Sequence, residues 1–218
     1  MSVLHDDLAA IYPQFGLEVA HAGLVLSPPT DVELLELAAI VGEPGAIVEP
    51  GREGPLLGWD DAGRTDPVDH FLRGHWRLRG RPTPQRWHAP FAVVLGGRAI
   101  GVATLAHEAG TERGTVSTRS WLARGDQGHG TGRRVRLMLL ELAFVHLGAT
   151  LATSSANEHN AASRRVSQRC GYRETHRGHD AFGVAVHAAV TPAAWRRRRL
   201  PDVVVEGVEP FRDAIDPG

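Results

Sequence analysis

A glycine-rich segment, residues 127–132 (QGHGTG), has the composition in this sequence best suited to binding a charged ligand. It follows a β-type run at residues 115–122 and precedes a helix expected over residues 132–147. Glycines let consecutive main-chain N–H groups converge on an anion, and the N-terminus of the following helix adds the positive end of its dipole. The segment therefore predicts a phosphate-binding loop.

The composition excludes the commonest phosphate-binding motifs. The chain has 218 residues, and its 24 Lys+Arg are all arginine. Without lysine there is no Walker-type loop, and Schiff-base chemistry on a lysine is also excluded. A Rossmann fingerprint fails as well, because Arg133 follows Gly132 and no acidic residue stands about twenty positions later in a suitable strand.

What the loop resembles is the Q/R-x-x-G-x-G/A signature of the GNAT family, the acyl-CoA-dependent N-acyltransferases. Gln127, Gly130 and Gly132 stand in the three defining positions. Residues 157–172 resemble the family's next motif, in which a strand is followed by N-x-x-S at the start of a helix and then by Gly-Tyr.

Two shorter segments extend the resemblance to the RimJ/RimL-like branch of the family. They are HWR at residues 75–77 and SWL at residues 120–122. The resemblance covers roughly residues 20–190. It implies an N-acyltransferase that takes acetyl-CoA, or another short acyl-CoA such as succinyl-CoA, as its acyl donor and needs no metal.

The resemblance also implies an α/β (α+β) fold in which a central mixed, mostly antiparallel sheet is flanked by helices and split at the acyl-CoA site. The residues themselves indicate helices that begin near Thr30 and Asp66, and a hairpin at Gly96-Gly97. We expect an acyltransferase domain over residues 1–195, followed by an arginine-rich run and a peripheral C-terminal tail over residues 196–218.

For the acyl-CoA site, the resemblance implies main-chain contacts to the pantetheine arm and a cradle of amides around the diphosphate. Leu122 and Ala123 would contact the pantetheine, with Arg124 and Arg134 as charge partners for the phosphates. Asn160 matches a family asparagine that binds the pantetheine, and it also reads as a helix N-cap. The expected cradle comprises Gln127, Gly128, Gly130, Thr131, Gly132 and Arg133.

The catalytic residues are less clear from the sequence. Many relatives place a tyrosine seven residues after the motif asparagine, where this chain has Ser167. RimL-like members instead suggest the serine three residues after it, so Ser163 is expected to donate a hydrogen bond to the departing thiolate. His107 and Glu108 are candidates for the base, acting through water, and the alternatives left open are His75 and Ser117.

Other candidate sites fail on their spacing or setting. His107-Glu108 begins an H-E-x-x-H zinc motif, but Thr111 stands in the last position. Cys170 precedes Gly171 at a helix end and is expected to be a buried structural residue. Further candidates for the wall of an acceptor site, or for core packing, are Leu56, Leu57 and Trp59.

Charge and hydropathy bear on whether the protein binds nucleic acid or membranes. The formal net charge is −1, which gives no overall attraction to nucleic acid or anionic lipid, so Arg196–Arg199 is expected to be solvated or paired with the acidic tail. No stretch is long and apolar enough for a membrane span or a signal peptide, and we expect a cytoplasmic protein.

The expected acceptor is a primary amine on a protein N-terminus, a lysine or a small molecule, and the enzyme is expected to form a homodimer. Two other functions stay open. One is a non-catalytic acyl-CoA-binding regulatory module, and the other is nucleic-acid binding through the arginine run.

Overall fold

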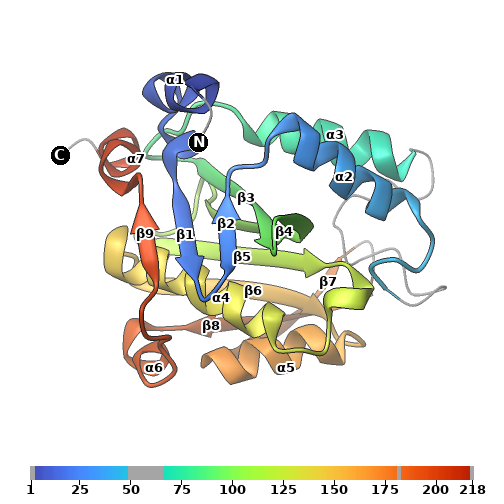
Figure 1. Ribbon diagram of the computed structural model, residues 1–218. Coiled ribbons are helices and arrows are strands. Elements are labelled where there is room, and N and C mark those ends of the chain that lie inside the picture. The colour runs from blue at the N-terminus through green and yellow to red at the C-terminus, as the bar shows by residue number, and fades with distance from the viewer. Residues whose placement is uncertain (1–2, 49–65, 181–182, 217–218) are drawn as a thin grey trace.

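A single sheet organises the fold. In a computed structural model that describes residues 3–48, 66–180 and 183–216, nine strands form one sheet in the order β7-β8-β6-β5-β4-β3-β2-β1-β9 (Figure 1). Only β5 and β6 pair in parallel; the other neighbouring strands are antiparallel. The strands are β1 (Glu18–His21), β2 (Leu24–Ser27), β3 (Trp87–Leu95), β4 (Arg98–His107), β5 (Thr115–Leu122), β6 (Leu151–Asn157), β7 (Arg173–Asp180), β8 (Gly183–Val190) and β9 (Val204–Glu206).

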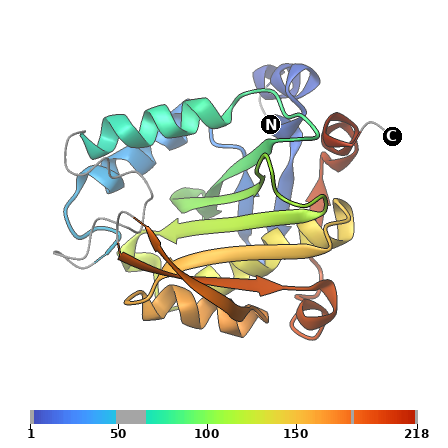
Figure 2. The same cartoon turned by 180° about the vertical axis from the view of Figure 1, so that it is seen from behind.

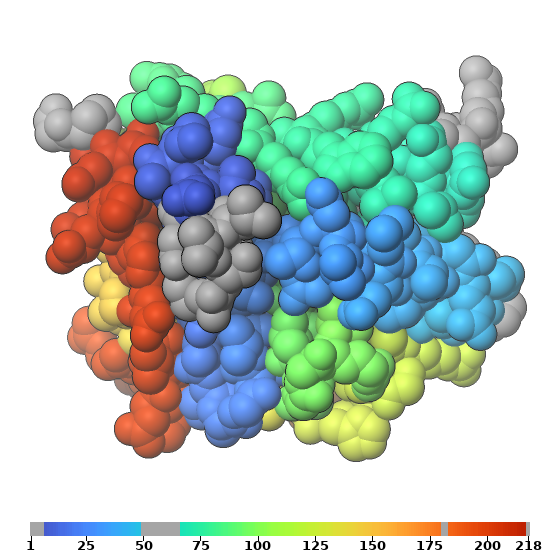
Figure 3. Space-filling view, turned by 45° about the horizontal axis from the view of Figure 1, so that its top comes forward, coloured from blue at the N-terminus to red at the C-terminus, as the bar shows by residue number. Residues whose placement is uncertain are grey.

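Helices cover both faces of the sheet, which confirms the expected α/β class. Helices α2 and α3 lie side by side over one face, as Figure 3 shows, and α4 and α5 lie on the opposite face (Figures 1 and 2). The helices are α1 (Val3–Ile11), α2 (Asp31–Gly42), α3 (Pro67–Leu78), α4 (Thr131–Glu141), α5 (Ala161–Cys170), α6 (Pro192–Arg196) and α7 (Val208–Ile215).

Each face of the sheet has its own hydrophobic cluster. On the α4 side, Val135 and Met138 pack against strand residues such as Leu122, and all three are almost fully buried. On the α2–α3 side, Leu37 and Phe71 pack near Trp121. Because β5 side chains alternate between the faces, one strand contributes to both clusters. Within the described ranges, no helix combines the length and apolar character needed to cross a bilayer.

The helix starts on the α2–α3 side follow the capping signals in the sequence. Thr30 caps α2, and its hydroxyl accepts from Glu33 N–H while the Glu33 carboxylate accepts from Thr30 N–H, which is a capping box. Asp66 caps α3 with Pro67 in the first helical position. The expected hairpin is also confirmed, since Gly96 and Gly97 take φ of 59° and 76° between β3 and β4.

The sheet opens between β5 and β6, as expected of a sheet split at its centre. Only three residue pairs join the two strands, and the last is Ser117↔Thr153. Beyond it, β5 stays paired with β4 as far as Leu122, and β6 stays paired with β8 as far as Asn157. Both strands therefore keep an outer partner while their inner edges diverge.

The C-terminal segment belongs to the same sheet and core. Strand β9 pairs with β1 at one edge of the sheet, with Val205 opposite Val19. Phe211 on α7 is fully buried and meets the Trp87 ring edge-on at 5.4 Å. Arg199 pairs with the buried Glu141 of α4 rather than with the acidic tail. Residues 199–215 therefore differ from the peripheral tail expected from the sequence, because apolar residues within this stretch complete the core.

A large-to-small change at Phe211 tests this integration. We expect Phe211→Ala to lower the free energy of unfolding by about 3–5 kcal/mol, because it leaves a cavity against Trp87. Denaturant titration followed by tryptophan fluorescence measures the change. The control Val204→Ala removes an exposed side chain from β9 and should cost much less. Equal effects of the two substitutions would show that α7 does not contribute to the core.

Candidate active site

The inner edge of β5 exposes unpaired main-chain groups where β6 has departed. Ala123 donates its N–H to Ile100 O of β4 at 2.7 Å. Alternate residues of an antiparallel ladder direct their main-chain groups to opposite sides, so Leu122, Ser120 and Thr118 direct theirs toward β6. Except for Leu122 O, which accepts from the Gln127 side chain, the opening thus presents a row of main-chain groups with the spacing of a strand.

The glycine loop lies at the mouth of this opening, directly before α4. Gly128 and Gly130 adopt φ of 82° and 83°, a left-handed conformation that glycine takes without steric cost. Nothing lies within 4 Å of the place where a Cβ would stand at either residue. Helix α4 begins at Thr131 without a side-chain cap, so its first N–H groups remain available to an anion.

Gln127 shapes the opening. Its side-chain amide donates to Leu122 O at 2.8 Å and to Ile47 O at 2.7 Å, which ties the end of β5 to the segment after α2. Ala123 donates its N–H to Ile100 O of β4, and its C=O accepts from Asp126 N–H. Of the two residues expected to contact the pantetheine, Leu122 therefore keeps a main-chain N–H facing the opening.

The arginines near the loop have different roles. Arg134 donates to His21 O at 2.7 Å and to Ala22 O at 3.0 Å, so it holds the β1–β2 hairpin. The described residues supply no carboxylate partner to the Arg133 side chain. Arg124 donates its main-chain N–H to Ala46 O. Arg133 is therefore better placed than Arg134 to meet a phosphate.

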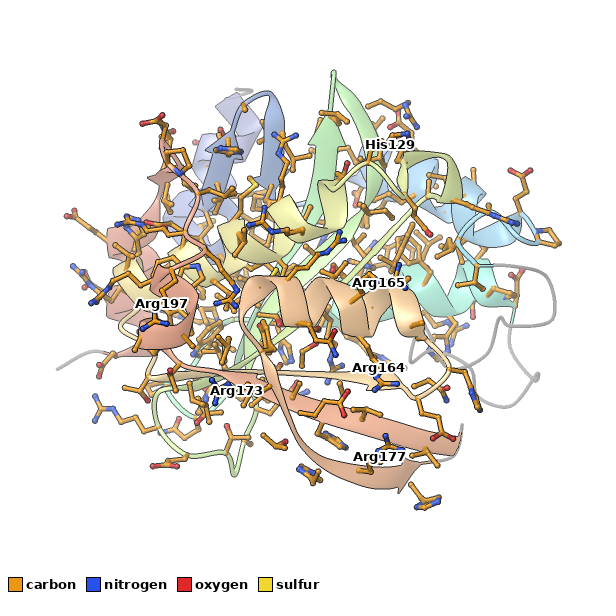
Figure 4. All side chains as sticks on the ribbon, turned by 90° about the horizontal axis from the view of Figure 1, so that it is seen from below. His129, Arg164, Arg165, Arg173, Arg177 and Arg197 are labelled. Carbon is orange, nitrogen blue, oxygen red and sulfur yellow. The ribbon has the colours of Figure 1, made fainter. Side chains whose placement is uncertain are left out.

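Helix α5 begins on the same side of the molecule as the loop. Figure 4 shows the N-terminal ends of α4 and α5 together, with His129 in the loop and Arg165 on α5. Asn160 caps α5, and its side-chain oxygen accepts from Ser163 N–H at 3.0 Å. This cap leaves the Asn160 NH2 group for another partner, and it orients the first turn that carries the Ser163 hydroxyl.

A buried polar cluster, which we name the vertex cluster, lies where β5 and β6 begin to separate. It consists of Thr118, Arg136, Ser154 and Tyr172. Thr118 donates its hydroxyl to Thr153 O at 3.1 Å, so the Tyr172 hydroxyl, 2.7 Å away, must donate to Thr118.

The Arg136 guanidinium donates to Ser154 Oγ at 2.9 Å and lies over the Tyr172 ring at 5.6 Å. Burial raises the pKa of the Tyr172 hydroxyl, and the nearby Arg136 charge opposes that shift. Sequence reasoning missed this cluster. Its one signal was an arginine at a position of α4 that the helical period assigns to the interior.

Cys170 is a buried structural residue. Burial raises the pKa of its thiol to about 11, so the thiol stays protonated near neutral pH. The thiol points to Arg133 O at 3.7 Å. This setting does not suit a nucleophile.

Comparison with known proteins decides the family. Residues 24–173 match the family described as "Acetyltransferase (GNAT) domain", which is more than half of the chain. The chain belongs to the GNAT acetyltransferases. Acyl-CoA-dependent acyl transfer is therefore the activity of this protein, and acyl-CoA is its co-substrate.

Solved GNAT structures share the fold at low sequence identity. RimJ of Mycobacterium smegmatis in complex with CoA-disulfide matches with a TM-score of 0.63 and 18% identity, over 90% of this chain and 91% of that chain. Aminoglycoside acetyltransferase AAC(6')-Ib with ribostamycin and coenzyme A gives 0.62 and 19%, over 83% and 99%. A GCN5-related N-acetyltransferase from Brucella melitensis gives 0.62 and 16%, over 82% and 80%.

The two expected bases of this GNAT protein lie away from the glycine loop. His107 follows the last β4–β5 pair, Ala106↔Ser117, whereas Leu122 is at the other end of the hairpin, about 20 Å along the strand. The His107 ring bonds Thr115 O at 2.8 Å.

Glu108 is engaged as well. Its carboxylate contacts His88 Nε2 at 3.1 Å, and the Arg86 guanidinium lies 3.7 Å from its other oxygen. The structure therefore does not bring His107 or Glu108 to the loop and Ser163. Leu56, Leu57 and Trp59 lie outside the described residues.

His75 lies on the opposite face of the sheet from α4. Its ring is buried and lies against the Phe71 ring, with the ring centres 4.5 Å apart and the planes tilted by 55°. Burial, assisted by the Arg79 charge, lowers the pKa of His75 to about 4. Its Nδ1 has no hydrogen-bond partner among the described residues, and the same holds for the Ser117 hydroxyl. A histidine with this pKa is neutral but only weakly basic near pH 7.

The loop predicts a specific effect of a single methyl group. Gly130→Ala should weaken CoA binding roughly tenfold. Alanine in a left-handed conformation costs about 1 kcal/mol, and a loop that changes conformation to avoid this strain turns its amides away from the ligand. Calorimetric titration with CoA measures the affinity. Gly110→Ala is the matched control, since Gly110 has φ of 83° and open surroundings in the β4–β5 turn, at the other end of β5 from the loop. Equal CoA affinity of the two variants would contradict the assignment of the loop.

His75 predicts a pH dependence of stability. Its pKa of about 4 lies below the ordinary value of 6.5, so the unfolded chain binds the proton more readily and stability falls as pH drops from 6.5 toward 4. The loss amounts to roughly 3 kcal/mol across this window. Denaturant titrations at several pH values give the free energy of unfolding as a function of pH. This free energy should fall less steeply with decreasing pH in His75→Gln than in the wild type, whereas the control His159→Gln, at an exposed position, should keep the wild-type pH dependence. An unchanged slope in His75→Gln would refute the assignment.

Proposed function

We propose that this GNAT protein transfers a short acyl group from acyl-CoA directly to a primary amine within a ternary complex. The observation that carries the proposal is the row of unpaired main-chain groups on β5 beside the uncapped start of α4. A strand-like pantetheine arm and a diphosphate together fit these two features. Their adjacency supports one elongated ligand rather than two separate ones.

In this proposal the diphosphate lies at the glycine loop and the pantetheine takes the place of β6 along β5. Leu122 supplies a main-chain N–H to the pantetheine, and the free NH2 group of Asn160 supplies a second contact. Ala123 lies beside the pantetheine in this proposal without a hydrogen bond to it, because both of its main-chain groups are already hydrogen-bonded within the protein. The amides assigned to the diphosphate are those of Gly128, Gly130, Thr131 and Gly132. The N–H groups of Gln127 and Arg133, also expected in the cradle, donate to Arg124 O at 3.2 Å and to Gly130 O at 3.1 Å.

The chemistry then needs three things: a neutral amine, a donor for the oxyanion and a donor for the sulfur. The amine nitrogen attacks the thioester carbonyl carbon, the C–S bond breaks, and the CoA thiolate finally takes up a proton. The Ser120 N–H faces the opening and suits the oxyanion. The Ser163 hydroxyl, in the first turn of α5, is assigned to the departing sulfur.

Deprotonation of the amine is assigned to solvent. A terminal α-amine has an ordinary pKa of about 8, so a useful neutral fraction exists near pH 7. His107 and Glu108 lie at the far end of the hairpin, so neither is assigned a contact with the amine. Positioning of the amine therefore provides most of the acceleration in this proposal.

The acceptor is proposed to be a protein N-terminus or lysine, or a small amine. The resemblance of the sequence to the RimJ/RimL-like branch favours a protein acceptor, and an aminoglycoside acetyltransferase among the structural neighbours represents the small amines. A panel should therefore contain peptides with a free α-amine, lysine peptides, aminoglycosides and polyamines. Thiol release from acetyl-CoA, confirmed by the mass of the acylated product, measures transfer.

The competing function is a regulatory module that binds acyl-CoA without turnover. Binding of CoA by calorimetry, together with no thiol release for any amine in the panel, would establish that alternative. This chain also provides an internal control. It has no lysine, so self-acylation on an amine is limited to its own N-terminus and cannot mimic acceptor turnover on side chains.

Ser163 predicts a split between turnover and affinity. Ser163→Ala should lower kcat about 10- to 100-fold, because the sulfur loses a hydrogen-bond donor, with little change in the affinity for acetyl-CoA. Steady-state kinetics and calorimetry measure the two quantities. Ser167→Ala, one turn later on the same helix, should leave kcat unchanged. A normal kcat in Ser163→Ala would remove this hydroxyl from the mechanism.

A further inference from the structure

Arg136 is a buried cation, and the described part of the chain gives it no counter-charge. It is 3% exposed, and no carboxylate among the described residues lies within ion-pair distance of its guanidinium. Elsewhere the chain does supply carboxylates to its arginines, as in Arg199–Glu141 and Arg164–Glu174. Burying a charge without a partner is costly, and such a charge commonly coordinates a ligand.

The groups that contact Arg136 are neutral. Ser154 accepts one hydrogen bond, the Tyr172 ring lies beneath the guanidinium, and the Cys170 thiol nearby stays protonated. The Arg136 Nε is buried and has no hydrogen-bond partner among the described residues. The cluster therefore fixes the guanidinium in place while leaving its charge, and one donor, unused.

The position of Arg136 relates it to the acyl end of the donor. Thr118 and Ser154 are the first residues of β5 and β6 beyond their last pair, so the vertex cluster marks the inner end of the opening. The glycine loop marks the outer end. With the diphosphate at the loop and the pantetheine along β5, the acyl group is the part of the donor that reaches furthest inward.

We propose that the preferred acyl donor is the CoA monothioester of a short dicarboxylic acid, and that Arg136 binds its free carboxylate. This inference rests on the proposed function. From Ser120, assigned to the thioester oxygen, to Thr118 is two strand residues, roughly 7 Å. A two-methylene spacer and a charge-assisted hydrogen bond of about 2.8 Å span that distance.

The carboxylate takes no part in bond making. The amine nitrogen forms the new C–N bond, the C–S bond breaks, and the sulfur receives the proton that the amine loses. The product is an amide that ends in a free carboxylate. The acceptor thereby changes from a cation to an anion, whereas acetylation would make it neutral.

Wild-type protein tests the donor class directly. With an amine acceptor from the panel, kcat/KM for succinyl-CoA should be about tenfold or more above the value for acetyl-CoA. It should be roughly 100-fold above the value for butyryl-CoA. Butyryl-CoA matches the chain length without the charge. Equal or better use of acetyl-CoA, or equal use of butyryl-CoA, would overturn the inference.

A variant assigns the preference to Arg136. Arg136→Gln should abolish the preference for succinyl-CoA and retain turnover of acetyl-CoA. Arg197 is an exposed arginine just after α6 (Figure 4), and the control Arg197→Gln should keep the wild-type ratio of the two kcat/KM values. An equal loss with both donors would show that Arg136 serves a step common to them, which contradicts the proposal.

Binding separates this inference from the proposed function and does not depend on a variant that folds. Calorimetry on the wild-type protein should give a lower Kd for succinyl-CoA than for butyryl-CoA, even if no amine is acylated. Absence of thiol release with every donor would defeat the proposed function alone. Equal Kd values for the two donors would defeat this inference alone.

Discussion

The early separation of β5 and β6 is the constraint on which the rest of the structure depends. Two neighbouring strands of a sheet normally satisfy each other's main-chain groups, yet here the pairing ends at Ser117↔Thr153 while both strands continue. Main-chain groups buried without partners are costly. The inner edge of β5 is therefore complementary to a ligand that can hydrogen-bond as a strand does, and the helix starts beside it are complementary to the charge such a ligand carries.

Side chains take over from the main chain at the point of separation. Thr118 donates its hydroxyl to Thr153 O, and Thr153 donates its own hydroxyl to Val116 O, so the last pair is bordered by two side-chain bonds. Tyr172 and Arg136 then continue the hydrogen-bonded cluster toward α4 and α5. The Tyr172 hydroxyl donates to the Thr118 hydroxyl, which donates to Thr153 O. Because every donor in this series has a defined acceptor, the cluster has a single arrangement and keeps the strands apart.

The sequence predicted the features that short-range chemistry determines. The capping box at Thr30, the proline start of α3 and the Gly96-Gly97 hairpin depend on neighbours within a few residues. The glycine loop was predicted for the same reason, although the occupation of its amides by a ligand stays a prediction.

Long-range features could not be found in this way. Arg136 and Tyr172 meet only because α4 and α5 pack on one face of the sheet. Strand β7 escaped notice because its residues, RETHRGHD, lie at a sheet edge and show no apolar alternation, and β9 needs the N-terminal strand β1 as its partner. That last pairing joins residues that are 188 positions apart in the sequence, since Glu18 stands opposite Glu206. During synthesis β1 keeps an open edge until residues 204–206 have left the ribosome, so the side of β1 that faces β9 is protected from aggregation late.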